Sequence, residues 1–233
     1  MPVVIITGAS QGTGKAIAEA FATEPDVRLG LFARNREKLE AVAAGCRAAG
    51  AVARIYTCDV THDRAVSKAA EASIRELGVP DVLVNNAGSF QPATMLETTP
   101  EIFREQIETN LTSAFVVTRA FLPAMIEAGK GTIFFMASVA SIKAYPSGVS
   151  YGVAKHGILG LARSLREEMK PYGIRVTAVI PGATRTASWD GVDLPEERFI
   201  PPEDVANAVL SVYRLSNRSV VEEILIRPQL GDI

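Results

Sequence analysis

Tyr151 and Lys155 are the residues of this sequence whose types and spacing most directly suggest chemistry. They lie four apart in an amphipathic pattern that continues to Lys170, so on a helix their side chains share one face. Because a neighbouring ammonium favours phenolate, we expect the pKa of Tyr151 to fall from about 10 toward the working pH. A tyrosine tuned in this way can give a proton to a carbonyl oxygen or take one from an alcohol.

Ser138 is a third candidate for the same chemistry. It follows the apolar run Gly131–Ala137, which is short enough for one buried strand. Active-site groups of open α/β sheets collect at the carboxyl ends of strands, so the Ser138 hydroxyl is expected to hold the same substrate oxygen. A Tyr-x-x-x-Lys pair is also common on helix surfaces, and the pair alone therefore does not establish a site.

The elements that position these residues begin with a glycine-rich turn. The β-branched run Val3–Thr7 predicts a strand buried on both faces, and it leads into G-A-S-Q-G-T-G (Gly8–Gly14) and then a helical pattern. Glycines let the backbone approach a pyrophosphate, and the helix N-terminus offers free N–H groups. The spacing is not the commoner G-x-G-x-x-G, but strand, glycine turn and helix together predict nucleotide binding. The alternative is a tight βα turn without a ligand.

The residue after the second expected strand, Val27–Ala33, is Arg34. In NAD-binding folds an Asp or Glu about 20 residues beyond the glycines holds the ribose 2′-hydroxyl. An arginine can instead pair with a 2′-phosphate in bidentate fashion. The sequence therefore predicts NADP(H) as the cofactor; the alternative is a solvated arginine at a helix start, near Glu37.

The alternation of strand and helix patterns continues along the chain. We expect further helices and strands as follows: helices over 37–49, 64–77, 99–128, 151–170 and 202–215, and strands over 51–57, 81–84, 174–180 and 220–226. This order predicts an α/β fold, Rossmann-type and doubly wound, with a mostly parallel seven-stranded sheet and helices on both faces. Neither repeats nor composition breaks divide the chain, so residues 1–233 are expected to form a single domain.

An irregular stretch interrupts this alternation near the end of the chain. Residues 187–201 show no periodicity and contain Trp189, the one tryptophan. They follow an expected strand end, where ligand crevices of open α/β sheets lie. Long loops without periodicity are often functional, so we predict a short substrate lid at about 183–201. The alternative is a Trp189 packed permanently on a neighbouring helix or subunit.

Composition excludes several classes of protein. With 48% hydrophobic and 21% charged residues the chain can build a core, and a net charge of −2 argues against a nucleic-acid partner. Two cysteines and two histidines are too few for a disulfide framework or a His-based metal site, so no metal is expected. The longest apolar stretch, 115–125, contains Arg119 and Pro123. We therefore expect a cytoplasmic protein with no membrane partner.

The motifs T-G-A-S-Q-G-T-G, D-V, N-N-A-G, Asn110, Ser138, Y-x-x-x-K and P-G-x-x-x-T occur in this order. Over nearly the whole chain the set resembles the short-chain dehydrogenase/reductase family. The resemblance implies Tyr151 as the acid/base, with Lys155 lowering its pKa and binding the nicotinamide ribose. It further implies that Ser138 orients the substrate oxygen and that Asn110 holds a water in a proton relay. The implied reaction is hydride transfer between NADP(H) and a small alcohol/carbonyl pair.

The resemblance and the reasoning above together assign the cofactor-binding residues. Asp59 and Val60 would lie at the adenine, whereas Pro181 and Gly182 would cover the nicotinamide and fix the face that transfers hydride. Related members commonly assemble as dimers or tetramers, which implies a homodimer or homotetramer. The full set is Gly8, Ser10, Gln11, Gly12, Thr13, Gly14, Arg34, Asn35, Asp59, Val60, Asn86, Ala87, Gly88, Tyr151, Lys155, Pro181, Gly182, Thr184 and Thr186.

Two alternatives to a small-carbonyl reductase stay open. The last strand pattern, V-E-E-I-L-I-R-P (Val221–Pro228), lacks the V-D-G-G ending frequent in ketoreductases of fatty-acid synthesis. This argues against a 3-oxoacyl thioester substrate. The segment between Thr186 and Pro202 is also short, so the sequence gives no basis for expecting a large substrate pocket. Thr13 also replaces the usual aliphatic residue, a mild packing change. The second alternative is a catalytically silent nucleotide-sensing regulator, which would not need an acid/base group such as Tyr151.

Overall fold

A seven-stranded sheet in the order β3-β2-β1-β4-β5-β6-β7 forms the centre of the computed structural model, which describes all 233 residues. Every neighbouring pair of strands is parallel. The strands are β1 (Val3–Thr7), β2 (Arg28–Ala33), β3 (Val52–Thr57), β4 (Val82–Asn85), β5 (Gly131–Met136), β6 (Ile174–Pro181) and β7 (Glu223–Ile226). The order reverses between β1 and β4, which makes the fold doubly wound and confirms the predicted class.

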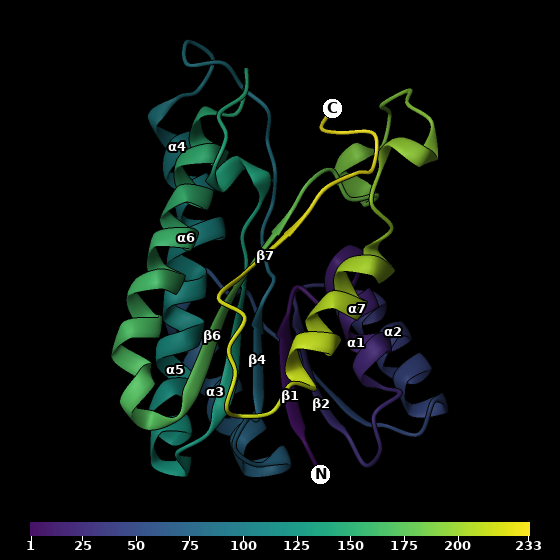
Figure 1. The fold of residues 1–233 in the computed structure, drawn as a ribbon, viewed down its shortest axis with the longest axis vertical. Helices are drawn as coiled ribbons and strands as arrows, with labels where there is room; N and C mark the ends of the chain where they lie inside the picture. The colour runs from purple at the N-terminus through teal and green to yellow at the C-terminus, as the bar shows by residue number, and fades with distance from the viewer.

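Helices cover both faces of this sheet. Figure 1 shows α1, α2 and α7 on one side and α5 and α6 on the other. The helices are α1 (Gly12–Phe21), α2 (Arg36–Ala48), α3 (Asp63–Leu77), α4 (Pro100–Ile107), α5 (Ser113–Ala128), α6 (Val149–Met169) and α7 (Pro202–Tyr213). Each side has its own apolar core: Phe21 and Leu39 belong to one cluster, and Phe121 and Leu159 to the other.

The strand β1 shows why the sequence builds two cores. Its successive side chains point to opposite faces, so Ile5 packs in the α3–α5–α6 cluster and Ile6 in the α1–α2–α7 cluster. Because both faces are covered, a continuous run of apolar β-branched residues is needed rather than an alternating pattern. Both isoleucines are fully buried.

The helix expected over residues 99–128 differs from the prediction in one place. Thr99 caps α4 by accepting from Ile102 N at 3.3 Å, and Pro100 opens the helix, both as the sequence indicates. Between α4 and α5, however, Glu108–Thr112 form a π-helical turn that carries the buried Asn110. Such turns insert an extra residue into an α-helix and are frequent at functional sites.

Residues 100–128 also form the one helix that meets a length and composition test for a membrane span, because an 18-residue window within it has a mean hydropathy of 1.3. In the fold, one face of this helix lies in the apolar core through Val117, Phe121 and Met125. The core helix of a soluble protein passes the same test, so the match carries no membrane assignment.

Two segments near the end of the chain were predicted less well. Strand β7 begins at Glu223 rather than at residue 220. The irregular segment contains 3₁₀ turns at Ala187–Trp189 and Glu196–Arg198, and its ends are held together by main-chain hydrogen bonds. Ile200 N donates to Ala183 O at 2.8 Å and Arg185 N to Ile200 O at 2.9 Å. The segment is therefore a loop whose two ends are joined by hydrogen bonds.

Candidate active site

A cleft of about 650 Å³ opens at the carboxyl ends of the strands, on both sides of the point where the strand order reverses. All the predicted catalytic and cofactor-binding residues except Gly14 line it. In open α/β sheets this crevice is the usual ligand site. The structure thus brings the glycine turn after β1, the ends of the five strands β2 to β6 and one face of α6 around a single space.

Gly14 contributes by packing rather than by lining the cleft. A Cβ atom at this position would lie 2.3 Å from Gly8 O and 2.4 Å from the Nδ2 atom of Asn86. The Asn86 amide itself donates to Thr7 O at 3.0 Å and to Gly8 O at 3.2 Å. The end of β4 therefore braces the glycine turn, and only a glycine lets α1 approach this closely.

The glycine turn presents main-chain groups to the cleft. Gly8 and Gly12 have φ angles of +65° and +54°, a left-handed conformation that favours glycine. Gln11 precedes α1 and its side chain makes no capping hydrogen bond, so the first N–H groups of the helix stay available. Together with the positive end of the helix dipole, this turn suits an anionic group such as a pyrophosphate.

Two cations flank the far end of the cleft, beyond the glycine turn. The Arg34 side chain is 80% exposed, and its Nη1 lies 3.9 Å from Asp59 Oδ2. Asn35 caps α2 by accepting from Lys38 N at 2.9 Å, and the Lys38 ammonium donates to the Gln11 side chain at 3.1 Å. Sequence reasoning missed Lys38; its place in the first turn of the helix that follows Arg34 was the available signal.

Asp59 is held as a carboxylate at the edge of the same region. Its Oδ1 accepts from the main-chain N of Thr61 at 3.0 Å and from the Thr61 hydroxyl at 2.7 Å. Partial burial opposes ionisation, but the hydrogen bonds from Thr61 and the charge of Arg34 outweigh it and lower the pKa of Asp59. Asp59 therefore presents an acceptor to the cleft.

Helix α6 places Tyr151 and Lys155 on one face, as their spacing predicts. The Lys155 ammonium lies 5.4 Å from the centroid of the Tyr151 ring. It donates to Met136 O, at the end of β5, at 2.8 Å. Lys155 is 5% exposed, so a nearly buried cation sits behind the tyrosine.

The expected fall in the pKa of Tyr151 is wrong for this structure. Burial raises the pKa of Tyr151 to about 12, although the nearby Ser138 hydroxyl favours the phenolate. Burial also lowers the pKa of Lys155 to about 8. Desolvation disfavours both charged forms, and the ammonium is engaged with Met136 O beneath the ring. The four-residue spacing could reveal the pair but not its burial.

Ser138 opens a short 3₁₀ turn, Val139–Ser141, at the end of β5. Its hydroxyl oxygen accepts from Ala140 N at 3.2 Å, and its main-chain N donates to the Ser141 hydroxyl at 3.2 Å. This reciprocal capping fixes the side chain at the strand end, where it borders the cleft together with Tyr151. The same hydroxyl is within hydrogen-bond reach of the Tyr151 oxygen, so the two polar groups face one another across the cleft wall.

Asn110 lies on the π-helical turn and its side chain is fully engaged. Its Oδ1 accepts from Ser89 N at 3.1 Å, and its Nδ2 donates to Ser89 O at 2.9 Å and Gln106 O at 3.1 Å. The amide therefore ties the π-helical turn to the loop after β4. Gln106, 1% exposed and 3.4 Å from the Ser89 hydroxyl, completes this network and was not foreseen from the sequence.

The other end of the cleft is lined by aromatic rings that sequence reasoning also missed. Phe90 packs edge-on against Tyr151, with ring centroids 5.0 Å apart, and lies 6.4 Å from the ring of Tyr145. A Cβ atom at Gly148 would lie 2.6 Å from the Tyr145 ring, so the glycine makes room for it. Trp189 borders the same space and packs on Phe199 at 5.2 Å.

The fold and this site identify the class of protein. The family model described as short chain dehydrogenase matches residues 2–196. The chain therefore belongs to the short-chain dehydrogenase family and is an oxidoreductase. No group of three or more His, Cys, Asp or Glu side chains is placed to hold a metal ion.

Individual relatives differ in what they act on. The chain is 36% identical to the sepiapterin reductase of Chlorobaculum tepidum, over 99% of this chain and 98% of that protein. It resembles the structure of an alcohol dehydrogenase from the archaeon Thermococcus sibiricus, complexed with 5-hydroxy-NADP: TM-score 0.92, 31% identity, 98% and 97% of the two chains covered. An actinorhodin polyketide ketoreductase variant with NADPH gives 0.89 and 29%, covering 100% and 98%.

Proposed function

We propose that this protein is an NADP(H)-dependent carbonyl reductase/alcohol dehydrogenase acting on a small alcohol–carbonyl pair. The observation that carries the proposal is one continuous cleft, with Arg34 and Lys38 at one end and Ser138 and Tyr151 at the other. The two similar structures named above are complexes with 5-hydroxy-NADP and with NADPH, which supports the same cofactor here.

The residues present fit this cofactor. The left-handed glycines at 8 and 12 keep side chains away from a pyrophosphate, and the first turn of α1 offers N–H groups to it. Arg34 and Lys38 supply positive charge for a 2′-phosphate, while Asp59 and Val60 border the adenine end. When bound, the cofactor supplies the hydride; the protein supplies orientation and the proton.

Tyr151 provides that proton in the direction of carbonyl reduction. As hydride reaches the carbonyl carbon, the Tyr151 O–H bond breaks, its proton moves to the carbonyl oxygen, and an alcohol results. The raised pKa keeps the phenol protonated at neutral pH, ready to donate. Ser138 donates a second hydrogen bond to the same oxygen, and the Lys155 ammonium stabilises the phenolate left behind.

The end of β6 shapes the nicotinamide side of the cleft. Pro181, Gly182, Thr184 and Thr186 lie together there, and the Thr184 hydroxyl donates to Gly182 O at 3.1 Å. A ring covered on one face by these residues would present only its other face to the substrate. We therefore propose that one of the two hydrogens at C4 of the nicotinamide is transferred.

Asn110 acts in this scheme through the backbone that it positions. Because its amide is bonded to Ser89 and Gln106, a relay water would be held by main-chain carbonyls of the π-helical turn. Such turns alter the i to i−4 hydrogen-bond ladder of a helix and so change which carbonyls are free. The network around Asn110 then sets the distance between this turn and Lys155.

Residues 183–201 are proposed to be a lid over the nicotinamide and substrate. The segment borders the cleft through Ser188 and Trp189 and is closed at its base by the Ala183–Ile200 contact. Closing over the reactants would exclude water from the path of the hydride. We also propose assembly as a homodimer or homotetramer through α5 and α6, whose surfaces expose Phe115 and Val153.

The test is a panel of ketones, aldehydes, hydroxy acids and sugars, followed through the absorbance of NADPH. The wild type should turn over members of at least one carbonyl class with NADPH, and the Tyr151→Phe variant should not. If no compound is reduced faster by the wild type than by the variant, the proposed activity is wrong.

A ketoreductase acting on 3-oxoacyl thioesters is the second candidate, supported by the resemblance to the polyketide ketoreductase. The segment 221–228 lacks the V-D-G-G ending frequent among such enzymes of fatty-acid synthesis, which favours free carbonyl compounds. Comparing acetoacetyl thioester with the best free carbonyl from the panel separates the two. A much higher kcat/KM for the thioester would replace the first proposal with the second.

A further inference from the structure

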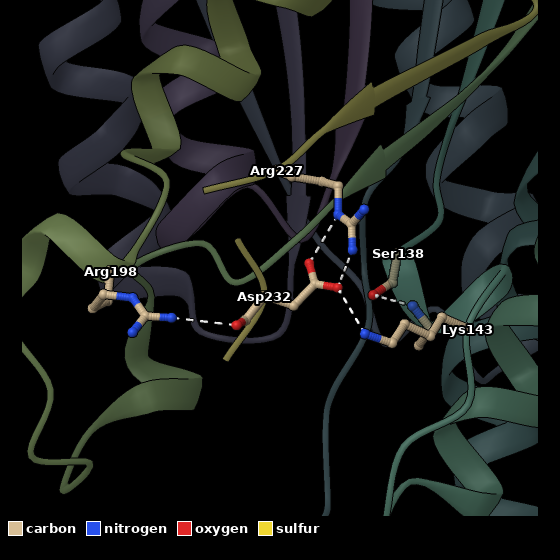
Figure 2. Close-up of polar contacts among 6 residues, drawn as sticks. Ser138, Lys143, Arg198, Arg227 and Asp232 are labelled. Carbon is tan, nitrogen blue, oxygen red and sulfur yellow. Dashed lines mark hydrogen bonds and ion pairs between the residues drawn. The ribbon is translucent and has the colours of Figure 1, made fainter. Parts of the chain in front are cut away.

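Asp232, which follows β7, places a carboxylate at the substrate end of the cleft. Figure 2 shows it between Arg227 and Lys143, with Arg198 on its other side. Arg227 holds it with two nitrogens, Nε lying 3.0 Å from Oδ1 and Nη2 bonding Oδ2. The Lys143 ammonium donates to Oδ2 at 3.2 Å, and Arg198 donates to the main-chain O of Asp232 at 3.3 Å.

The three partners of Asp232 come from three separate segments of the chain, and of the three only Lys143 lines the cleft. Lys143 follows the turn of Ser138, Arg227 follows β7, and Arg198 belongs to the lid segment 183–201. Asp232 is the one carboxylate within ion-pair distance of Lys143 or of Arg227. Without it, two side-chain positive charges would have no anionic partner at this part of the cleft.

The exposure of these groups bears on what an incoming substrate meets. The Asp232 side chain is 17% exposed, whereas those of Lys143 and Arg227 are 62% and 47% exposed. Hydrogen bonds from Arg227 and Lys143 hold the pKa of Asp232 below its usual range, so it stays ionised. By pairing with both cations, Asp232 therefore lowers the positive charge that a negatively charged substrate would meet at Lys143, which lines the cleft.

We propose that Asp232 is a specificity-determining residue that makes this cleft select neutral over anionic carbonyl substrates. It does so by pairing with Lys143, the cation at this end of the cleft that an anionic group on the substrate would otherwise use. The inference rests on the proposed carbonyl reduction and narrows its substrate class. Repulsion between a charge on a ligand and a like charge on the protein can weaken the binding of a wrong ligand as effectively as new contacts strengthen the binding of the right one.

Asp232 also has a structural role that the test must separate from charge selection. It fixes the segment 228–233, of which Ile233 lines the cleft and Pro228 packs against Gly182. Loosening this segment would change the turnover of every substrate, whatever its charge. The informative quantity is therefore the ratio of kcat/KM for an anionic substrate to that for a neutral substrate of the same shape.

The experiment uses 4-carboxybenzaldehyde and 4-carbamoylbenzaldehyde, which have nearly the same shape and differ chiefly in charge, with the full chain and saturating NADPH. Should the panel favour another neutral carbonyl, that compound and its carboxylated analogue replace this pair. The wild type should prefer the neutral partner. Asp232→Asn should raise the anionic-to-neutral ratio by about 5- to 30-fold, and high salt should reduce the gain. Asp232→Ser serves as a second variant if the asparagine form is unstable.

Two further variants sharpen the result. Adding Lys143→Met to Asp232→Asn should bring the ratio back toward that of the wild type, because one of the two freed cations is then gone. Asp193→Asn is the matched control: it removes the same charge from an exposed position of the lid segment that does not line the cleft. Its ratio should match that of the wild type.

Three outcomes would overturn the inference while leaving carbonyl reduction intact. In the first, the wild type prefers the anionic substrate. In the second, the anionic-to-neutral ratio of kcat/KM is unchanged or lower in both Asp232 variants. In the third, this ratio rises as much in Asp193→Asn as in Asp232→Asn. If the wild type reduces none of the carbonyl compounds with NADPH, the proposed function itself fails and the inference falls with it.

Discussion

The two ends of the cleft are built in different ways. At the cofactor end, main-chain groups of the β1–α1 turn and neighbouring strand ends form the surface, and Gly8, Gly12 and Gly14 keep side chains out of it. At the substrate end, the surface consists of side chains such as Tyr145 and Asp232, brought in from distant segments. A surface formed by main-chain groups suits a cofactor that is the same in every reaction. A surface formed by side chains can be altered by single substitutions, and with it the substrate that fits.

Tyr151 and Lys155 lie where the two ends meet, and the largest effect is expected there. Tyr151→Phe removes a hydroxyl and little volume, so NADPH affinity should survive while kcat falls by about 100-fold or more. Binding titrations and steady-state rates measured side by side test this. Turnover that persists in the variant would move the acid/base chemistry to another residue.

Arg34 tests whether the cofactor end is specified by charge as well as by backbone shape. Losing a charge-assisted contact costs about 1.5–3 kcal/mol, so Arg34→Asp should raise the KM for NADPH roughly 10- to 150-fold and leave NADH equal or better. Arg36→Asp, the same reversal two residues away and outside the cleft, is the control. A wild type that prefers NADH, or a variant that still prefers NADPH, contradicts the role given to Arg34.

The same contrast explains what could be read from the sequence. Strand, glycine turn and helix follow one another along the chain, so the cofactor end and the doubly wound sheet were predictable from local pattern. Lys143 and Asp232 are 89 residues apart, and no periodicity relates them. The π-helical turn was missed for a similar reason: the Asn110 amide beneath it bonds Ser89, 21 residues away.

The Tyr151–Lys155 pair shows a second limit of sequence reasoning. Residue types and spacing identified the pair, but the sign of the pKa shift depends on burial, which only the folded structure reveals. The phenol that the spacing suggested would ionise readily is instead held protonated. The spacing correctly placed the two side chains together at the cleft, and it gave the wrong direction for the pKa shift of Tyr151.

Burial of Lys155 has a consequence for stability that can be measured. Because its pKa is lowered from 10.5 to about 8, the unfolded state binds more protons than the folded state between these values. Stability should therefore rise with pH across this window, and Lys155→Met should lack about 1–2 kcal/mol of that rise. Denaturant unfolding of both proteins at about pH 8 and about pH 10 gives the comparison; parallel slopes would mean an unshifted pKa.

The smallest expected effect concerns the lid at the substrate end. Trp189 is the one tryptophan and is half-buried against Phe199, so its emission reports on this segment alone. NADP⁺ should quench or shift that emission, and a substrate analogue should extend the change. An unchanged spectrum, with unchanged protease sensitivity of residues 187–201 at saturating cofactor, would show that the segment does not close.

The central claim is that hydride passes from NADPH to a carbonyl carbon where the cofactor end and the substrate end of the cleft meet. Isotopic labelling tests this claim most directly. NADPH carrying deuterium at one or the other C4 position is supplied with a carbonyl compound that the enzyme reduces, and the alcohol is analysed. Deuterium should reach the carbinol carbon from one labelled form and not from the other if, as we propose, residues 181–186 cover one face of the ring. Transfer from both forms, or an alcohol without deuterium from either, would contradict the account.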